Sequence, residues 1–369
     1  MKNREAFLAL VRGGLWETEV RLSKYEPIDY SKVLSFAEEQ SVVGLVAAGL
    51  EHVKDVKIPK EEVLQFVGKT LQLEQRNLEM NRFVGVLVEK LREGGIYTLL
   101  VKGQGIAQCY EKPLWRSSGD IDLLLSEDNY IRAKVFLSQI ATRIEDEDVS
   151  SKHLCMTIEP WTVELHGTLH GGLTNRIDIE LDQVQNSVFY GGDVRSWLNG
   201  KTQVFLPGID NDIIFVFSHI LQHFYRGGIG LRQICDWCRL LYYYRDSVDI
   251  KLLEARLKKM RIMSEWRVFA VLAVDYLGMP QNTMPFYDYT IKYKNKALRV
   301  LLDILSKGNF GHNIDMSYRK NEPFLIKKII AIYRYSVDSF KHALVFPCNS
   351  ICIWWNLMTL GARSTLRNL

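Results

Sequence analysis

The chain has 369 residues, with 47 Lys and Arg against 43 Asp and Glu, a formal net charge of +4, and 47% hydrophobic residues. These values are ordinary for a globular protein and exclude collagen-like, low-complexity and disordered chains. A surplus of four positive charges is also too small to indicate a nucleic-acid-binding protein, since such domains concentrate a strong basic excess on one face. At about 150 residues per domain, the length predicts two or three domains.

The N-terminal sequence contains early charges but no uninterrupted apolar core and no small-residue cleavage site, so it does not predict a secretory signal. We therefore expect the six cysteines to be reduced and the protein to be cytoplasmic. One uncharged stretch, residues 343–362, is about as long as a membrane-spanning helix. Pro347 and three polar residues interrupt it, which favours a buried C-terminal helix over a membrane span.

Apolar residues at helical spacing predict helices from residue 5 to about Gly94, with Pro59 at a first helical position. The glycines at 94 and 95 end this region, and the hydrophobic period then changes. The next elements predicted are a strand at 96–101, a short helix at 103–110, a strand at 120–125 and an amphipathic helix at 127–140. Further strands are expected at 153–158 and 161–169, followed by a less regular stretch to Pro207.

Helical periodicity returns after Pro207 and predicts helices at 211–225, 231–244, 250–259, 265–277, 291–306 and 323–342. We therefore expect an α+β fold with a mixed-sheet core over residues 96–207. An N-terminal helical region, 1–95, and a C-terminal helical domain, 208–369, flank that core. No repeat or biased linker separates the three parts, so we expect them to pack together without flexible tethers.

Asp120 and Asp122 lie two residues apart in a predicted strand, so both carboxylates point to one side of it, about 6.6 Å apart. Two carboxylates aimed at one point repel each other unless a cation intervenes, and Mg²⁺ prefers such oxygen ligands. Two metal ions about 3.5–4 Å apart can bridge paired carboxylates and a polyphosphate. The alternative is an exposed strand edge whose acids face water, which is the commoner reason for an isolated DxD match.

A strand that runs into a glycine turn and then a helix precedes these acids, and this order favours a phosphate-binding site. Gly103 and Gly105 let the backbone approach a phosphate closely, and Lys102 supplies a cation beside it. Arg116, four residues before Asp120, can reach another phosphate bidentately. The glycine turn and the acids together predict a site for a metal-bound polyphosphate.

A third carboxylate would complete a metal site, and Glu164 offers one on an alternating strand whose polar face it shares with Thr162 and His166. Glu164 can act as a metal ligand or as the general base for an attacking hydroxyl. A structural pairing with a neighbouring arginine is the alternative. Asp178 and Glu180 have the same two-residue spacing and compete for the role of third carboxylate.

The chain resembles the uncharacterised nucleotidyltransferase family within the DNA polymerase β-like superfamily, which carries a KG turn, a tyrosine, an arginine and then GDIDLL. The corresponding residues here are Lys102-Gly103, Tyr110, Arg116 and 119–124, so the close resemblance covers roughly residues 96–125. The VELH sequence at 163–166 is similar to the family's acid-plus-histidine strand. Leu231-Arg232 with Asp236 resembles the family's helical continuation.

The resemblance implies a nucleotidyltransferase core in which Asp120, Asp122 and Glu164 hold Mg²⁺, or alternatively Mn²⁺, against a nucleoside triphosphate such as ATP. It also implies transfer of a nucleoside monophosphate to an acceptor with release of pyrophosphate. The residues expected to bind the nucleotide are Lys102, Gly103, Gln104, Gly105, Arg116 and Gly119. The superfamily's usual glycine-serine pair is replaced here by Lys102-Gly103-Gln104, so Lys102 and the backbone amides of 103–105 are expected to take over the serine contact.

The resemblance does not give the acceptor, because the superfamily modifies RNA ends, antibiotics, proteins and small metabolites. We expect a small molecule or a protein rather than a nucleic acid, since the composition does not promise a continuous basic groove. The residues expected on the acceptor side are His166, His219, His223 and Arg232. The alternative function is a nucleotide-binding regulatory or scaffolding protein that kept the fold without efficient catalysis.

His219 and His223 lie four apart on a predicted helix, a spacing that can hold zinc. No glutamate follows His219 and no third ligand is evident, which favours packing or acceptor contact. Cys235 and Cys238 are predicted to be core residues rather than a redox pair. The glycine-rich sequence 227–230 favours a turn between two helices, and a loop closing over the nucleotide is the alternative. The basic stretch 292–299 favours a solvated helix face over contact with a nucleic-acid backbone, and 308–312 predicts a turn.

Overall fold

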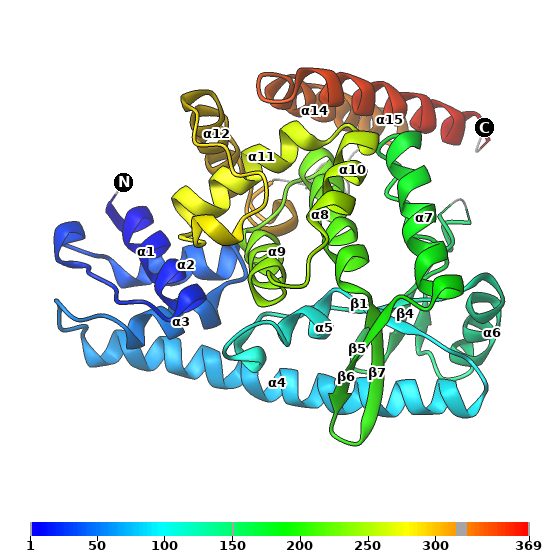
Figure 1. Cartoon of the computed structure of the whole chain (residues 1–369), viewed down its shortest axis with the longest axis horizontal. Coiled ribbons are helices and arrows are strands. Elements are labelled where there is room, and N and C mark those ends of the chain that lie inside the picture. The colour runs from blue at the N-terminus through cyan, green and yellow to red at the C-terminus, as the bar shows by residue number, and fades with distance from the viewer. Residues whose placement is uncertain (1, 150, 315–322, 368–369) are drawn as a thin grey trace.

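The structure, a computed structural model, describes residues 2–149, 151–314 and 323–367. Helices at both ends of the chain surround a five-stranded mixed sheet (Figure 1). This arrangement confirms the predicted α+β class, while the predicted domain limits at residues 95 and 207 stay a prediction.

The N-terminal helices are α1 (Lys2–Trp16), α2 (Tyr30–Glu39), α3 (Val43–Glu51) and α4 (Lys60–Glu93). The central elements are β1 (Leu99–Val101), α5 (Gly103–Ala107), β2 (Ile121–Leu124), α6 (Glu127–Ser138), β3 (Arg143–Ile144), β4 (His153–Ile158), β5 (Trp161–His166), α7 (Asn175–Gly191), β6 (Val194–Asn199) and β7 (Thr202–Pro207). The C-terminal helices are α8 (Ile209–Arg226), α9 (Leu231–Tyr243), α10 (Ile250–Met260), α11 (Met263–Val271), α12 (Ile291–Lys307), α14 (Phe324–Ala343) and α15 (Pro347–Arg367).

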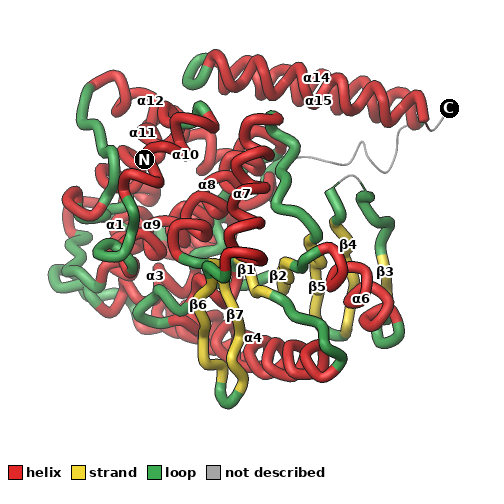
Figure 2. The backbone as a smooth tube through the Cα atoms, turned by 45° about the vertical axis from the view of Figure 1, so that its right-hand side comes forward, coloured by secondary structure: helices red, strands yellow, loops and turns green. Residues whose placement is uncertain are grey.

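The sheet has the strand order β1-β2-β5-β4-β3 (Figure 2). In it β2 and β5 are parallel and the other pairs are antiparallel. Strict alternation along β4 and β5 buries Leu154, Met156, Val163 and Leu165 in one hydrophobic core. The C-terminal half of α4 and the inner side of α6 pack into that same core. Alternation therefore turns the polar residues of β4 and β5 toward the other face of the sheet, and Figure 1 shows α7 and α8 on that side.

The stretch before Pro207 differs from the prediction, because it forms α7 and the β6–β7 hairpin instead of a less regular segment. Helix α7 buries Ile177, Leu181 and Val184 at helical spacing. In a helix, residues two apart face different directions, so Asp178 and Glu180 do not present a carboxylate pair. Glu180 is buried and pairs with Lys259 at 3.2 Å. These two acids therefore do not join the other predicted carboxylates.

The uncharged C-terminal stretch is helical from Pro347 onward, but the expectation that it is buried is wrong along much of α15. Ile351 and Trp355 expose 60% and 64% of their surface. The helix packs lengthwise against α14, where Trp354 Nε1 donates to Ser336 Oγ at 2.9 Å. Asn349 and Asn356 of α15 also donate to the carbonyls of Arg261 and Leu173, so the helix is covered in part. Among the described residues, no helix combines the length and the apolar character needed to cross a membrane.

Cysteine placement follows the prediction for the core, since Cys109, Cys235 and Cys238 are buried. All six cysteines are free thiols. Burial in apolar surroundings raises the pKa of the Cys238 thiol, which argues against a redox role for the pair on α9.

Candidate active site

The parallel pairing of β2 with β5 brings the predicted carboxylates together. Asp122 lies opposite Glu164 in the register of the two strands, and Asp120 directly precedes β2. One oxygen of each of these three residues lies within 4.8 Å of the others. The Asp122 side chain is almost completely buried, whereas Asp120 and Glu164 are partly accessible. The sheet thus builds one cluster from acids separated by more than forty positions in the sequence.

Lys102 reaches this cluster from the turn between β1 and α5. Its Nζ lies 2.6 Å from Oδ1 of Asp122, and its side chain is 14% exposed. The Lys102 backbone has a φ of 59°, a region that residues other than glycine rarely adopt, and Gly103 follows with a φ of 44°. Such strain costs about 1–3 kcal/mol and persists where surrounding contacts enforce it. The turn therefore directs the Lys102 ammonium group toward the carboxylates at the cost of a strained backbone conformation.

Two histidines on neighbouring strands extend the polar face of the sheet. Nε2 of His166 lies 2.9 Å from Asp122 Oδ1 and 3.5 Å from Glu164 Oε2. His153 on β4 stands opposite His166, and its Nε2 lies 3.1 Å from the same Glu164 oxygen. Sequence reasoning missed His153, although its position in the alternation of β4 signals that it faces the polar side.

Repulsion between neighbouring acids shapes the titration of the cluster. The Asp122 charge, with burial in second place, raises the pKa of Asp120. Burial also opposes ionisation of Asp122, but Lys102 and His166 outweigh it and lower the net pKa of that carboxyl. Burial likewise disfavours a charge on Lys102, and the three nearby carboxylates outweigh it and raise the lysine pKa. Asp120 is thus the acid whose negative charge the cluster tolerates least.

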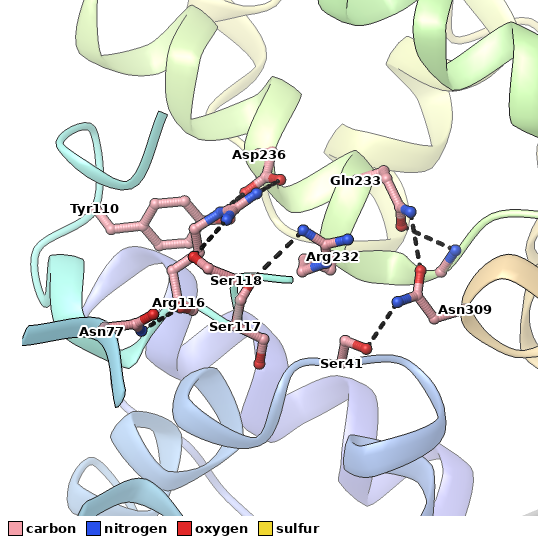
Figure 3. A network of polar contacts seen from close by, with 11 residues as sticks. Ser41, Asn77, Tyr110, Arg116, Ser117, Ser118, Arg232, Gln233, Asp236 and Asn309 are labelled. Atoms are coloured by element: carbon pink, nitrogen blue, oxygen red, sulfur yellow. Dashed lines mark hydrogen bonds and ion pairs between the residues drawn. The ribbon is translucent and has the colours of Figure 1, made fainter. Parts of the chain in front are cut away.

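Arg116, which is predicted from the sequence to contact a phosphate, forms a buried ion pair with Asp236 of α9 (Figure 3). Its Nε and Nη2 donate to the two Asp236 oxygens at 2.9 and 2.7 Å. The third guanidinium nitrogen donates to Ser118 Oγ at 2.9 Å, and the Tyr110 hydroxyl donates to Asp236 at 2.8 Å. Every nitrogen of the guanidinium is therefore engaged within the protein.

The loop 116–119, which leads into Asp120, is held from two helices. Asn77 of α4 donates to the carbonyl of Arg116 at 2.7 Å, and Arg76 donates to that of Ser118 at 2.9 Å. From α9, Arg232 donates to the carbonyl of Ser117 at 3.4 Å (Figure 3). These contacts hold the segment that carries Asp120, and no local sequence pattern predicts them.

The side chain of Gln104 points into the protein rather than toward the carboxylates. It is buried, and its Nε2 donates to Asn77 Oδ1 at 3.2 Å. Gly105 is packed so closely that a Cβ there would lie 2.7 Å from Leu206 Cδ2. The surroundings of Gly119, in contrast, leave open space for a side chain. Within the predicted nucleotide-binding set, Gln104 and Gly105 thus have packing roles visible in the structure.

His219 and His223 lie on α8 as predicted, with their Nε2 atoms 3.1 Å apart. Burial lowers the pKa of His223 to about 4, and the positive charge of Lys102 adds to this effect. Burial and Lys102 also lower the pKa of His219. Among the described residues, neither histidine belongs to a group of three potential metal ligands. Both imidazoles are therefore neutral near pH 7, and the charges of Lys102 and Glu164 act on them.

The segment 308–312 contacts the same region through Phe310. The Phe310 ring centroid lies 4.8 Å from that of His223, and the Arg232 guanidinium lies 5.8 Å from the Phe310 centroid. The glycine-rich sequence 227–230 is the turn between α8 and α9, as predicted. Outside the cluster, His170 pairs with Asp182 at 2.6 Å, and Lys294 of the basic stretch pairs with Asp275 at 3.4 Å.

The comparisons with known proteins give one result. A model of the uncharacterised nucleotidyltransferase family matches residues 26–278, which include the whole sheet and the carboxylate cluster. No curated protein and no solved structure matches the chain significantly. Because the matched segment spans well over half of the chain, this protein belongs to the uncharacterised nucleotidyltransferase family.

Proposed function

We propose that this chain is a metal-dependent nucleotidyltransferase that moves a nucleoside monophosphate from a nucleoside triphosphate to an acceptor, with release of pyrophosphate. The observation that carries the proposal is the convergence of Asp120, Asp122 and Glu164 within 4.8 Å, beside Lys102, in a member of this family. Three carboxylates and one lysine make a site with surplus negative charge, which a divalent cation would neutralise.

The donor set fits Mg²⁺ or Mn²⁺. All three ligands offer carboxylate oxygen, the donor that hard divalent cations prefer. The raised pKa of Asp120 shows that the cluster disfavours a third negative charge, and a bound cation would remove that penalty. A cation held here would supply charge neutralisation for a triphosphate.

The residues of the chain divide the work as follows. Lys102 is placed to contact phosphate oxygens, and His166 orients Asp122 through the 2.9 Å contact. Although burial opposes its ionisation, the contacts from His153 and His166 lower the net pKa of Glu164, which suits a ligand better than a general base. In the reaction, an acceptor nucleophile bonds to the α-phosphorus while the bond between that phosphorus and the α–β bridging oxygen breaks. Pyrophosphate leaves with the bridging oxygen and the electron pair, and the acceptor's proton passes to water.

The acceptor side is formed, in this proposal, by the α8–α9 face that carries His219, His223 and Arg232. Neutral imidazoles and one arginine offer hydrogen bonds and a single positive charge, which suits a small molecule or a protein side chain better than a nucleic-acid backbone.

A nucleotide-binding protein with weak catalysis is the second candidate, and two observations favour it. Asp122 is already engaged by Lys102 and His166, and all Arg116 nitrogens are bonded within the protein. Nucleotide binding without transfer by the wild-type chain would establish this alternative.

The test is Asp120→Asn, assayed with radiolabelled nucleoside triphosphates, Mg²⁺ or Mn²⁺ and a cell extract as the acceptor source. We expect transfer to fall about 10³-fold or more, because a charged ligand is lost. Thermal stability should not fall, because the fold disfavours the Asp120 charge. Asp128→Asn, in the first turn of α6, is the matched control and should keep full activity. Full activity in Asp120→Asn would contradict the proposal.

A further inference from the structure

The polar face of the sheet carries a second group of potential metal ligands beside the three carboxylates. His153, Glu164 and His166 each offer one ligand atom, and these atoms lie within 4.8 Å of one another. The two histidines stand opposite each other in the antiparallel register of β4 and β5. Because both strands alternate strictly between buried and partly exposed residues, the backbone itself places both imidazoles on the side that bears Glu164.

The spacing of these atoms suits a compact coordination sphere. Nε2 of His153 and Nε2 of His166 lie 3.1 and 3.5 Å from the same Glu164 oxygen. In a tetrahedral site with bonds of about 2.1 Å, neighbouring ligand atoms are roughly 3.4 Å apart. The two rings are tilted by 43°, with centroids 4.8 Å apart, so they are not stacked flat on each other. Small side-chain adjustments would bring the three atoms around one ion.

The donor chemistry distinguishes this group from the carboxylate cluster. Two imidazoles and one carboxylate form the donor set of many zinc centres that keep an open coordination position. Mg²⁺, in contrast, prefers oxygen ligands and keeps its waters. Glu164 belongs to both groups, and His166 also contacts Asp122, so an ion at one position would lie next to an ion at the other.

We propose that His153, Glu164 and His166 form a second metal position that selects a transition-metal ion of the Zn²⁺ class. The role of that ion as a partner to the carboxylate-bound cation rests on the proposed function, whereas its binding does not. Without a metal, the same contacts would be hydrogen bonds between the two imidazoles and the acids, and the experiment distinguishes the two states.

The experiment uses the full chain without a polyhistidine tag, stripped of metal with a chelator and titrated calorimetrically with Zn²⁺ in excess Mg²⁺. The wild-type protein should bind one Zn²⁺ that His153→Gln binds at least tenfold more weakly. His170→Gln is the matched control, because His170 pairs with Asp182 outside the cluster and its loss should leave Zn²⁺ affinity unchanged. Equal affinity in the wild type and in His153→Gln would overturn the proposal.

Two further measurements separate this inference from the proposed function. X-ray absorption of the Zn²⁺ complex should show two imidazole ligands in the wild type and one in His153→Gln, and an all-oxygen shell would overturn the site. His153→Asn, at a partly exposed position, gives a second variant if His153→Gln folds poorly.

Asp120→Asn should lose nucleotidyl transfer but still bind Zn²⁺. Zn²⁺ binding without any transfer would defeat the proposed function alone, and transfer with unaltered Zn²⁺ affinity in His153→Gln would defeat this inference alone.

Discussion

Two groups of charged residues lie next to each other in this protein and differ in their balance. In the carboxylate cluster, Asp120, Asp122 and Glu164 share one lysine, Lys102, and one histidine, His166, which contacts Asp122 and Glu164. In the neighbouring group, the buried Arg116 meets the buried Asp236, and Tyr110 completes the contacts. The first group is rich in acid and partly open, whereas the second is balanced and closed.

This difference separates binding from positioning. A buried pair of opposite charges in which every guanidinium nitrogen is hydrogen-bonded does not require a further ion, so the Arg116–Asp236 contact holds the loop in place. A cluster with unbalanced charge becomes more stable when a cation arrives, so the acids beside that loop suit ligand binding. An aspartate next to a basic residue therefore does not by itself predict either ligand binding or a structural role. The balance of positive and negative charges around the aspartate determines which of the two roles it has.

The largest effect is expected from breaking the balanced pair with Asp236→Asn. The substitution keeps the shape of the side chain but leaves the Arg116 charge buried without a counter-ion. We expect a loss of about 3–5 kcal/mol in the free energy of unfolding. Urea denaturation followed by circular dichroism measures this loss.

Glu111→Gln is the matched control, because Glu111 also pairs with a buried arginine, Arg239, but its own side chain is 57% exposed. Arg239 keeps its bonds to the carbonyls of Cys109 and Leu15, so the cost should stay below about 1 kcal/mol. Equal losses in the two variants would show that the balanced pair is no more important than a surface contact.

A smaller effect, dependent on pH, is expected where α8 faces the cluster. Burial, helped by the Lys102 charge, lowers the pKa of His223 from 6.5 to about 4. Between those values the unfolded chain binds a proton that the folded chain does not, so stability falls as the pH drops from about 6.5 toward 4. His223 contributes up to about 3 kcal/mol to that fall.

His223→Gln removes this titration, and urea midpoints at pH 4.5 and 7 should therefore differ less in the variant than in the wild type. His166 gives the opposite sign. Burial lowers its pKa, but contacts with Asp122 and Glu164 outweigh burial and raise the net value. Its contribution is therefore present below about pH 6.5 and is lost as the pH rises through the folded pKa. If the urea midpoint of His223→Gln changes with pH as much as that of the wild type, the His223 imidazole of the wild-type protein is more exposed to solvent than its lowered pKa indicates.

The carboxylate cluster was predictable because it follows from local patterns. Asp122 and Glu164 each lie on a short alternating strand, and only the pairing of β2 with β5 had to be supplied by the fold. The helix α7 was missed because Asp178 and Glu180 mimic strand alternation, while its apolar residues follow the helical period. Where two periods overlap, the longer apolar pattern decided the structure.

The balanced pair was not predictable in the same way. Arg116 and Asp236 are 120 positions apart, and Asn77 reaches the loop from 39 positions upstream. A basic residue near a glycine turn predicts a phosphate contact equally well whether or not a distant helix brings an aspartate to it. The number and sign of buried partners is a property of tertiary packing, which single-sequence patterns do not encode.

Gln104→Ala gives the smallest expected effect. It tests whether the glycine turn belongs with the ligand-binding cluster or with the contacts that position the loop 116–119. Its amide donates to Asn77, which also holds the loop 116–119, so the side chain belongs to the positioning contacts. We expect a loss of about 1–2 kcal/mol, because a buried hydrogen bond disappears. Nucleotide affinity, measured by calorimetry with Mg²⁺, should change less than about twofold, since Lys102 and the backbone remain. Gln108→Ala, at a less buried position one turn later, is the control for stability. A tenfold loss of nucleotide affinity at unchanged stability would instead identify Gln104 as a nucleotide-binding residue, because direct phosphate contact produces that combination.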